Sequence, residues 1–273
     1  MVQLSFTARV LAVPVASLAL GLGPSAWQPA PPLQKAAEVQ LAPRVVAEID
    51  LGKMKGALVR QLAWSADGTQ LYLQTYDPDR TALPREIFHY VIPAEGGTPQ
   101  QVAAIPDWAQ SYLAWKTAQA APGDPAFKIE LQEEKGISSA TAMPMAGDMA
   151  KGGAAGGGPT GVPAETVMDM ARQSQNTVTR RFRLKGETIG EWVNHPIIPG
   201  LTFGWGPAGS GLVAFSEKKG GTLIVMDNSG AKRKFEGTKN VAAPSWSADG
   251  SRLAYLEGSS KTRFSLVVAT VTK

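Results

Sequence analysis

The chain has 273 residues, of which 44% are hydrophobic and 18% are charged, a composition typical of a globular protein large enough to bury a substantial core. Its formal net charge of +4 reflects a modest surplus of Lys and Arg over Asp and Glu. The absence of Cys excludes disulfides, thiolate metal sites and cysteine nucleophiles.

The N-terminus carries an apolar run, residues 10–23, preceded by the charge of Arg9. The run is too short to span a bilayer, which needs about 20 apolar residues, but it suits the core of a secretory signal. Small residues at Ser25 and Ala26 offer a cleavage site. We therefore expect residues 1–26 to be a signal peptide and the product to be periplasmic or secreted, with no transmembrane segment after cleavage. An uncleaved anchor or a wrongly assigned start codon is the alternative.

Two segments lack the pattern of a folded element. Residues 27–43 are rich in Pro, Ala and Gln and have no apolar period, which predicts an extended linker. Residues 143–163 form a Gly- and Met-rich run with too little apolar surface to fold, so we expect a disordered insertion there. Between them, the alternating and β-branched residues of 44–51 predict the first strand.

One short pattern occurs twice in the chain. The stretch Trp64–Leu73 (Trp-Ser-Ala-Asp-Gly-Thr-Gln-Leu-Tyr-Leu) returns as Trp246–Leu256 (Trp-Ser-Ala-Asp-Gly-Ser-Arg-Leu-Ala-Tyr-Leu). Each copy predicts a strand that ends at the Trp, a tight turn whose Gly takes positive φ, and a second strand of alternating apolar residues. A looser copy begins at Trp205, which precedes Trp246 by 41 residues. A period of about 40–45 residues with four short strands is typical of a β-propeller blade.

This period predicts five units, which begin near Trp64, Ile105, Ala164, Trp205 and Trp246. In the second unit, residues 111–115 are an apolar strand candidate. The third unit is the least regular, because residues 165–173 look helical and only 177–184 and 187–193 look like strands. We expect five blades, one of them irregular. A four-bladed ring with an inserted excursion is the alternative.

The last unit supplies three strands and lacks a fourth, whereas residues 44–51 are a spare strand at the other end of the propeller. Pairing the two would close the ring and remove open strand edges that invite aggregation. We therefore predict an all-β fold: a single propeller of four-stranded blades over residues 44–273, closed by pairing of its N-terminal strand with the last blade.

These repeats resemble those of TolB-like β-propellers, a group with WD40-like repeats. Their pattern is Trp-Ser-Pro-Asp-Gly, then Ile-Ala-Phe, then Ile-Tyr-Val-Met-Asp and a Gly turn, and residues 222–230 (Thr-Leu-Ile-Val-Met-Asp-Asn-Ser-Gly) are similar to its last part. The match is poor over residues 105–193. Ala66 and Ala248 replace the usual Pro, and residues 27–43 leave no room for the N-terminal α/β domain of TolB. The resemblance implies an exported TolB-like propeller without that domain.

The sequence offers little catalytic chemistry. Its two His residues, His89 in a strand and His195 in a turn, favour structural or solvent roles. Neither a Gly-x-Ser-x-Gly elbow nor a His-Glu-x-x-His motif occurs. The repeated Asp67 and Asp249 are expected to accept backbone N–H bonds in their turns. We therefore assign no catalytic residues, and the binding residues stay unknown.

Metal binding has two weak candidates. Asp77 and Asp79 could offer two carboxylates to Ca²⁺, but six or more oxygens are required. Thioethers suit Cu(I), but no Cys or His joins the Met cluster, which comprises Met143, Met145, Met149, Met168 and Met170. We expect neither a metal nor a cofactor.

The basic residues form only short clusters, Arg180–Lys185 and Lys232–Lys234, and the first alternates as a half-wet strand does. Nucleic-acid binding would need a concentrated basic face, so we do not expect it.

We expect a monomeric, non-catalytic interaction or scaffold module that binds another envelope protein or a peptide. The alternative is a propeller-type hydrolase or lyase, or the gating domain of a peptidase, acting on peptides or glycans. A pair of Asp or Glu residues with perturbed pKa values facing the channel would discriminate the two.

Overall fold

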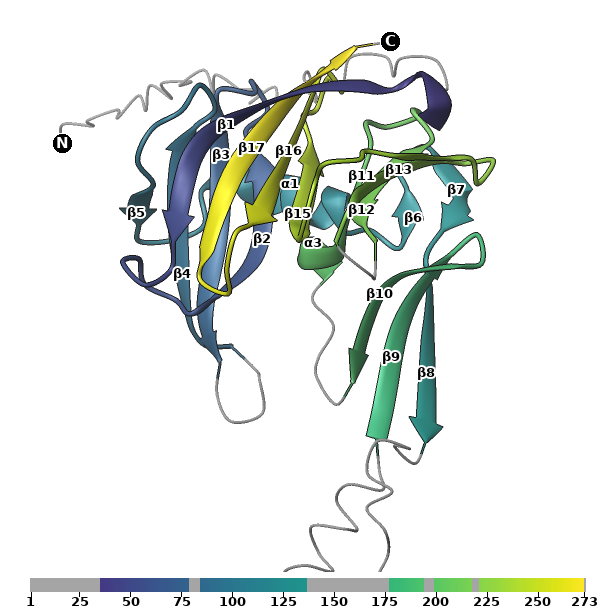
Figure 1. Cartoon of the computed structure of the whole chain (residues 1–273), viewed down its shortest axis with the longest axis horizontal. Coiled ribbons are helices and arrows are strands. Elements are labelled where there is room, and N and C mark those ends of the chain that lie inside the picture. The colour runs from purple at the N-terminus through teal and green to yellow at the C-terminus, as the bar shows by residue number, and fades with distance from the viewer. Residues whose placement is uncertain (1–34, 79–83, 137–176, 194–198, 218–220, 273) are drawn as a thin grey trace, which may run out of the picture.

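The computed structural model describes residues 35–78, 84–136, 177–193, 199–217 and 221–272, and the fold is all-β with a propeller arrangement of its sheets (Figure 1). The helical elements are short: η1 (Ala36–Glu38), α1 (Asp107–Lys116) and α3 (Pro199–Thr202). The strands are β1 (Gln40–Asp50), β2 (Leu58–Trp64), β3 (Gln70–Pro78), β4 (Pro84–Pro93), β5 (Gln100–Val102), β6 (Ala120–Ala121), β7 (Asp124–Lys128), β8 (Glu130–Gly136), β9 (Thr177–Leu184), β10 (Glu187–Val193), β11 (Phe203–Trp205), β12 (Leu212–Ser216), β13 (Leu223–Asp227), β14 (Lys232–Lys234), β15 (Val241–Trp246), β16 (Arg252–Gly258) and β17 (Arg263–Thr272).

The described strands form four units rather than the expected five. Blade 1 has the strand order β2-β3-β4-β5, blade 3 has β11-β12-β13-β14, and blade 4 has β15-β16-β17-β1. The unit between blades 1 and 3, here called blade 2, consists of α1, the β6-β7 pair and the three-stranded sheet β8-β9-β10. The four-bladed alternative is therefore the one that the structure supports.

The structure has one blade fewer than expected because α1 replaces a predicted strand. Residues 111–115 were expected to form a strand, but they lie inside this helix. Its buried residues are Ala109, Tyr112, Leu113 and Lys116, whose spacing is that of one helix face. Because α1 contacts both β2 and β11, it takes the place next to the axis that the inner strand occupies in the other blades.

The predicted closure of the ring is confirmed. Strand β1 pairs antiparallel with β17 along its whole length, from Gln40 opposite Thr272 to Asp50 opposite Arg263, with a bulge at Val46. The strand begins four residues before the expected Arg44, and η1 precedes it. The linker expected at 27–43 was therefore wrong for its described residues, 35–43, which η1 and β1 occupy. Ala36 and Val39 are buried against blades 3 and 4, a tertiary contact that the sequence pattern does not show.

The repeated Trp residues join neighbouring units at the ends of the inner strands. Trp64 of blade 1 donates its indole N–H to the Ser245 carbonyl of blade 4 at 2.8 Å. Trp205 of blade 3 donates to the Ala118 carbonyl, just after α1, at 2.6 Å. Trp64, Trp205 and Trp246 are fully or almost fully buried. The repeat thus marks the joints of the ring as well as its strands.

Both repeated turns have the predicted geometry. Gly68 and Gly250 have φ values of 69° and 70°, in the left-handed region that favours glycine. Asp67 accepts the backbone N–H of Thr69 at 3.0 Å, and Asp249 accepts that of Ser251 at 3.0 Å. The prediction that these two Asp residues hold their turns is confirmed.

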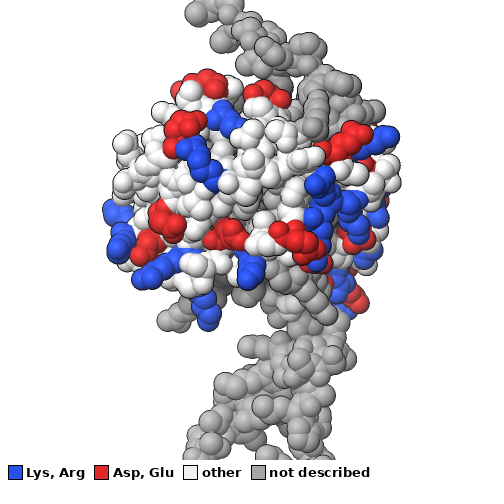
Figure 2. Space-filling model, turned by 45° about the horizontal axis from the view of Figure 1, so that its top comes forward, with Lys and Arg blue, Asp and Glu red and all other residues white. Residues whose placement is uncertain are grey.

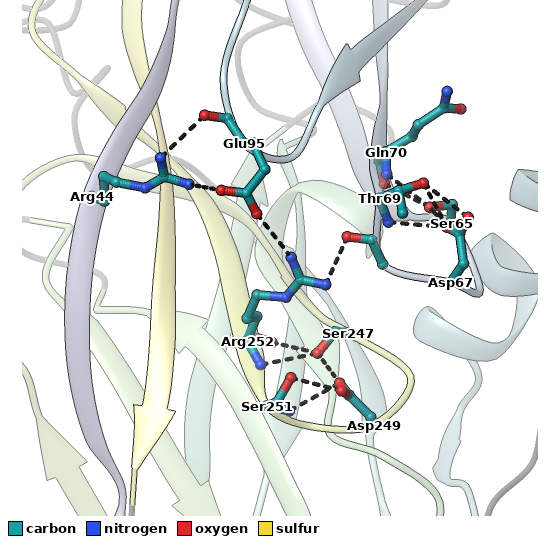
Figure 3. Close-up of polar contacts among 11 residues, drawn as sticks. Arg44, Ser65, Asp67, Thr69, Gln70, Glu95, Ser247, Asp249, Ser251 and Arg252 are labelled. Atoms are coloured by element: carbon teal, nitrogen blue, oxygen red, sulfur yellow. Dashed lines mark hydrogen bonds and ion pairs between the residues drawn. The ribbon is translucent and has the colours of Figure 1, made fainter.

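Arg252 links the two turns across the joint between blades 1 and 4 (Figure 3). Its guanidinium donates to the Gly68 carbonyl at 2.7 Å and lies 4.6 Å from the centre of the Trp64 ring. Its second nitrogen lies 3.8 Å from Glu95, whose carboxylate also pairs with Arg44 of β1 at 2.8 Å. Arg252 therefore stabilises the joint by packing on Trp64 and by one partly buried hydrogen bond. Arg44 adds mainly a solvent-exposed ion pair.

Three expectations lie wholly outside the described residues: the signal peptide at 1–26, the insertion at 143–163 and the helix at 165–173. The strands expected at 177–184 and 187–193 are β9 and β10. Within the described part of the chain, no helix is long and apolar enough to cross a membrane.

Closure by β1 can be tested with a matched pair of substitutions. Ile49 is 1% exposed and Val45 is 56% exposed on the same strand. We expect Ile49→Ala to lower the free energy of unfolding by about 2–4 kcal/mol, because it opens a cavity between β1 and the core. Val45→Ala should change it by less than about 0.5 kcal/mol. Chemical denaturation measures both, and equal effects would contradict a structural role for β1.

The joint between blades 1 and 4 allows a second paired test. Arg252→Ala should cost about 1–3 kcal/mol, since it removes the stacking on Trp64 and leaves the Gly68 carbonyl unpaired. Arg44→Ala should cost less than about 1 kcal/mol, because the pair with Glu95 is exposed. Thermal melts of the two variants beside the parent decide the order, and a larger loss for Arg44→Ala would show that the account of the joint is wrong.

Candidate functional site

The axis of the ring, where propellers often carry ligands, is filled by the side chain of Lys116. This residue ends α1 and is completely buried. Its ammonium group donates to the Leu62 carbonyl of β2 at 2.6 Å and to the Gly200 carbonyl of α3 at 3.3 Å. A Cβ added at Gly204 of β11 would lie 3.3 Å from its Cε atom and only 2.3 Å from the Pro244 carbonyl of β15. Lys116 therefore reaches the point where all four units meet.

Burial changes the acid–base chemistry of this side chain. Desolvation of the charged amine lowers the pKa of Lys116 to about 7. The two carbonyl acceptors replace the lost hydration of the amine only in part, and no carboxylate is hydrogen-bonded to it among the described residues. The charged form of the amine is therefore disfavoured, and Lys116 is the most strongly perturbed cation in the described part of the chain.

Above Lys116, one turn earlier in α1, a second group of buried polar atoms lies near the axis. The Tyr112 hydroxyl faces Ser245 of β15, and burial raises the pKa of this tyrosine far above its usual value. The Tyr112 and Ser245 hydroxyls have only each other, and the Trp246 indole N–H lacks a hydrogen-bond partner among the described residues. An unpaired buried polar atom costs about 1–3 kcal/mol, so this is the least saturated part of the ring.

The acidic residues whose pKa values shift are held in turns and do not form a pair at the axis. The hydrogen bond from Ser65 is the main cause that lowers the pKa of Asp67. Burial raises the pKa of Asp249, but hydrogen bonds from Ser247 and Ser251 keep it below its usual range. Asp124 and Asp227 also have lowered pKa values, and both accept hydrogen bonds. These carboxylates stay ionised at neutral pH, which suits acceptors better than proton donors.

His89 belongs to a polar chain on one face of blade 1. Gln61 donates to Gln74 at 3.0 Å, and Gln74 donates to the Tyr72 hydroxyl at 2.8 Å. The Tyr72 hydroxyl and His89 Nδ1 are 2.7 Å apart. Desolvation lowers the pKa of His89, which favours the neutral ring. The Tyr72 hydroxyl already accepts from Gln74, so it donates to Nδ1 when the imidazole proton is on Nε2. The contacts of His89 with Tyr72 are internal to the blade, in line with a structural role.

The other sequence candidates contribute no site. Asp77 accepts the backbone N–H of Ala57 at 2.8 Å and so fixes the start of β2. The described residues contain no group of three or more His, Asp or Glu side chains that could hold a metal ion. Candidates that lie outside the described residues are Asp79, His195, Met143, Met145, Met149, Met168 and Met170.

The basic clusters are interleaved with acids, as Figure 2 shows for one face of the molecule. Arg181 of β9 pairs with Glu191 at 2.6 Å and also with Glu134. Lys232 of β14 pairs with Glu187 at 2.8 Å, and Lys234 pairs with Glu217 at 3.0 Å. These contacts neutralise charge locally, so neither cluster forms a continuous basic surface.

A cleft opens at the rim of the ring, between the outer strands of blades 1 and 4. Its volume is about 460 Å³, within the range of ligand pockets. We call it the rim cleft, and its lining residues are Glu48, Asp50, Lys53, Met54, Lys55, Tyr90, Thr98, Pro99 and Gln101. None of these residues stands out in the sequence as a binding residue, because they come from β1, the loop after it, β4, the turn after β4 and β5, which meet only through ring closure.

The buried amine of Lys116 predicts a pH dependence of stability. Its pKa is about 7 in the folded chain and near 10.5 in the unfolded chain, so the unfolded state binds more protons between these values. Stability contributed by this group therefore rises with pH from about 7 to about 10. We expect Lys116→Met to remove that rise and to be as stable as the parent, or up to about 3 kcal/mol more stable, at pH 6.

Urea unfolding at four pH values between 6 and 10 measures this difference. Lys128→Met, which replaces an exposed lysine of β7, is the matched control and should keep the slope of the parent. An unchanged slope in Lys116→Met would contradict the assignment of the buried amine.

No protein-family model matches the sequence, and no curated protein matches it either. Among solved structures, the chain is similar to an oligogalacturonate lyase in complex with manganese, at 10% identity and a TM-score of 0.22. The matched region covers 75% of this chain and 46% of the lyase, so the chain spans about half the length of that structure. At these values the likeness carries no argument about family or activity, and the fold rests on the arrangement of the strands described above.

Proposed function

We propose that this chain is an exported TolB-like β-propeller that works as a non-catalytic interaction or scaffold module in the cell envelope. Its partner would be another envelope protein or a peptide. The repeats Trp64–Leu73 and Trp246–Leu256 support the TolB-like part of the proposal. The apolar run at residues 10–23, which lies outside the described residues, supports export.

The observation that carries the proposal is the contrast between the axis and the rim. At the axis, Lys116 and Tyr112 are buried and packed between the inner elements. At the rim, the cleft between blades 1 and 4 is open and bears side chains of both charges. A ligand would therefore meet this propeller from outside, on strand edges and loops, which is the geometry of protein recognition.

The turn carboxylates fit the same function. Asp67 and Asp249 accept hydrogen bonds within the turns that hold the joints, so neither carboxylate is placed as a proton donor for a ligand. This favours a binding module over the hydrolase or lyase that the sequence kept as an alternative.

An amine-reactive cross-linking experiment in native envelope extract tests the proposal. We expect the processed protein in the periplasmic or secreted fraction, a single partner in near-stoichiometric yield, and cross-links concentrated at Lys53 and Lys55 of the rim cleft. Lys232 and Lys234, which are exposed but ion-paired on blade 3, provide internal controls. Mass spectrometry identifies both the partner and the linked lysines.

Two results would contradict the proposal. Retention of the whole chain in the cytoplasm would overturn export. An exported, partnerless protein that cleaves peptides or glycans would overturn the non-catalytic role and favour the enzyme alternative.

A further inference from the structure

The rim cleft is a wedge between two strands that are tied together at one end. Gly97, in the turn after β4, donates its backbone N–H to the Val46 carbonyl of β1 at 3.2 Å. Beyond this contact β1 continues to Asp50, while β5 begins at Gln100, and the cleft lies between them. The tie fixes the spacing of the two walls.

Each wall is the edge strand of its sheet. Among the described strands, β1 pairs only with β17, and β5 pairs only with β4. In an antiparallel sheet, about half of the backbone N–H and C=O groups of an edge strand point away from its neighbour. On β1 the carbonyls of Val46 and Asp50 are already hydrogen-bonded to Gly97 and to the loop after the strand, so an added strand would pair with the backbone between them. Extended peptides bind to sheet edges in this way.

The charges in the cleft are separated by sign. Glu48 and Asp50 lie two residues apart on β1, hence on the same side of the strand. Lys53 and Lys55 follow in the loop after β1 and close one end of the cleft. Lys53 makes no ion pair in the described part of the chain, whereas Asp50 has a loose contact with Arg263, at 3.7 Å, whose side chain is 70% exposed. The cleft thus has an acidic wall, formed by Glu48 and Asp50, and a basic end, formed by Lys53 and Lys55.

The basic end is rigid. The Tyr90 hydroxyl at the floor of the cleft accepts the backbone N–H of Lys55 at 2.8 Å and donates to its carbonyl at 3.2 Å. Thr75 donates to the same carbonyl at 2.7 Å, and the amides of Lys53 and Met54 bond back to Asp50. A site whose loop is already fixed loses little conformational entropy on binding.

We propose that the rim cleft binds an extended peptide segment of a partner protein, which adds a strand between β1 and β5. A basic side chain of that segment would lie against Glu48 and Asp50, and an acidic side chain two residues away, or a C-terminal carboxylate, would lie against Lys53 and Lys55. This inference rests on the proposed binding function and names the chemistry of the ligand for that same surface.

The test uses the full mature chain and fluorescein-labelled peptides of defined sequence. The charged probe is Gly-Thr-Lys-Val-Glu-Val-Gly, which places Lys and Glu on one side of an extended strand. The neutral probe has Gln at both positions, and a third probe keeps the charges but carries N-methyl groups on alternate amides. We expect fluorescence polarisation to show the charged probe binding at least about tenfold more tightly than either of the others.

Charge reversal at the cleft gives the matched variants. Glu48→Lys and Lys53→Glu change exposed side chains, and each should weaken binding of the charged probe by about tenfold or more. Glu236→Lys makes the same charge change at a side chain that is 82% exposed on blade 3 and should leave binding unchanged. Hydrogen exchange should show slower exchange in β1 and β5 when the charged probe is bound.

Equal binding of the three probes, or binding that Glu48→Lys and Glu236→Lys weaken alike, would overturn the inference. Failure of the inference is separable from failure of the proposed function. If the Glu48→Lys protein still captures the partner of the parent from envelope extract, the binding function stands and the rim cleft is the wrong site. If the parent itself captures no partner, the proposed function fails first.

Discussion

One buried amine fills the axis of the ring. Lys116 ends α1, and its long side chain reaches the carbonyls of Leu62 in β2 and Gly200 in α3 across the axis. A buried charge is tolerated only when hydrogen bonds replace its water, and here backbone carbonyls from two other segments do so. The lowered pKa of the amine shows that the replacement is incomplete. Lys116 therefore fills the axis, although burial disfavours the charged form of its amine.

The joints between blades reuse the same local pattern that builds the blades. The turn after Trp64 and the turn after Trp246 are each held by an Asp and a Gly, and Arg252 beside the second turn reaches the Gly68 carbonyl of the first (Figure 3). A repeat that sets strand, turn and joint together places its copies at similar positions around the ring. Because one short pattern serves strand, turn and joint, it is easy to recognise in the sequence. For the same reason it carries no information about the ligand.

Closure at the axis moves recognition outward. Blades 1 and 4 touch through Trp64 and Arg252 near the axis and through Gly97 and Val46 further out, and the rim cleft lies beyond the last of these contacts. Its walls are β1 and β5, the outermost strands of neighbouring blades. These strands stay at the edges of their sheets when the ring closes, because only the inner strands face the axis. The same topology that protects the core therefore leaves a charged and rigid cleft at the surface, where a partner can reach it.

Local periodicity, turn chemistry and the count of strands were enough to predict most strands, the two Asp-Gly turns, the all-β class and the pairing of the N-terminal strand with the last blade. They did not predict β6, β7 or β8, and the strand expected at 111–115 was wrong. Tertiary structure alone decided the number of blades: Tyr112 and Leu113 fit a strand as well as a helix by apolarity, and only packing between β2 and β11 selects α1. It alone revealed Lys116 and the rim cleft as well. Lys116 is buried, and Glu48, Lys53 and Tyr90 come together, only when distant segments meet on closure of the ring. A local sequence pattern does not predict which distant segments meet.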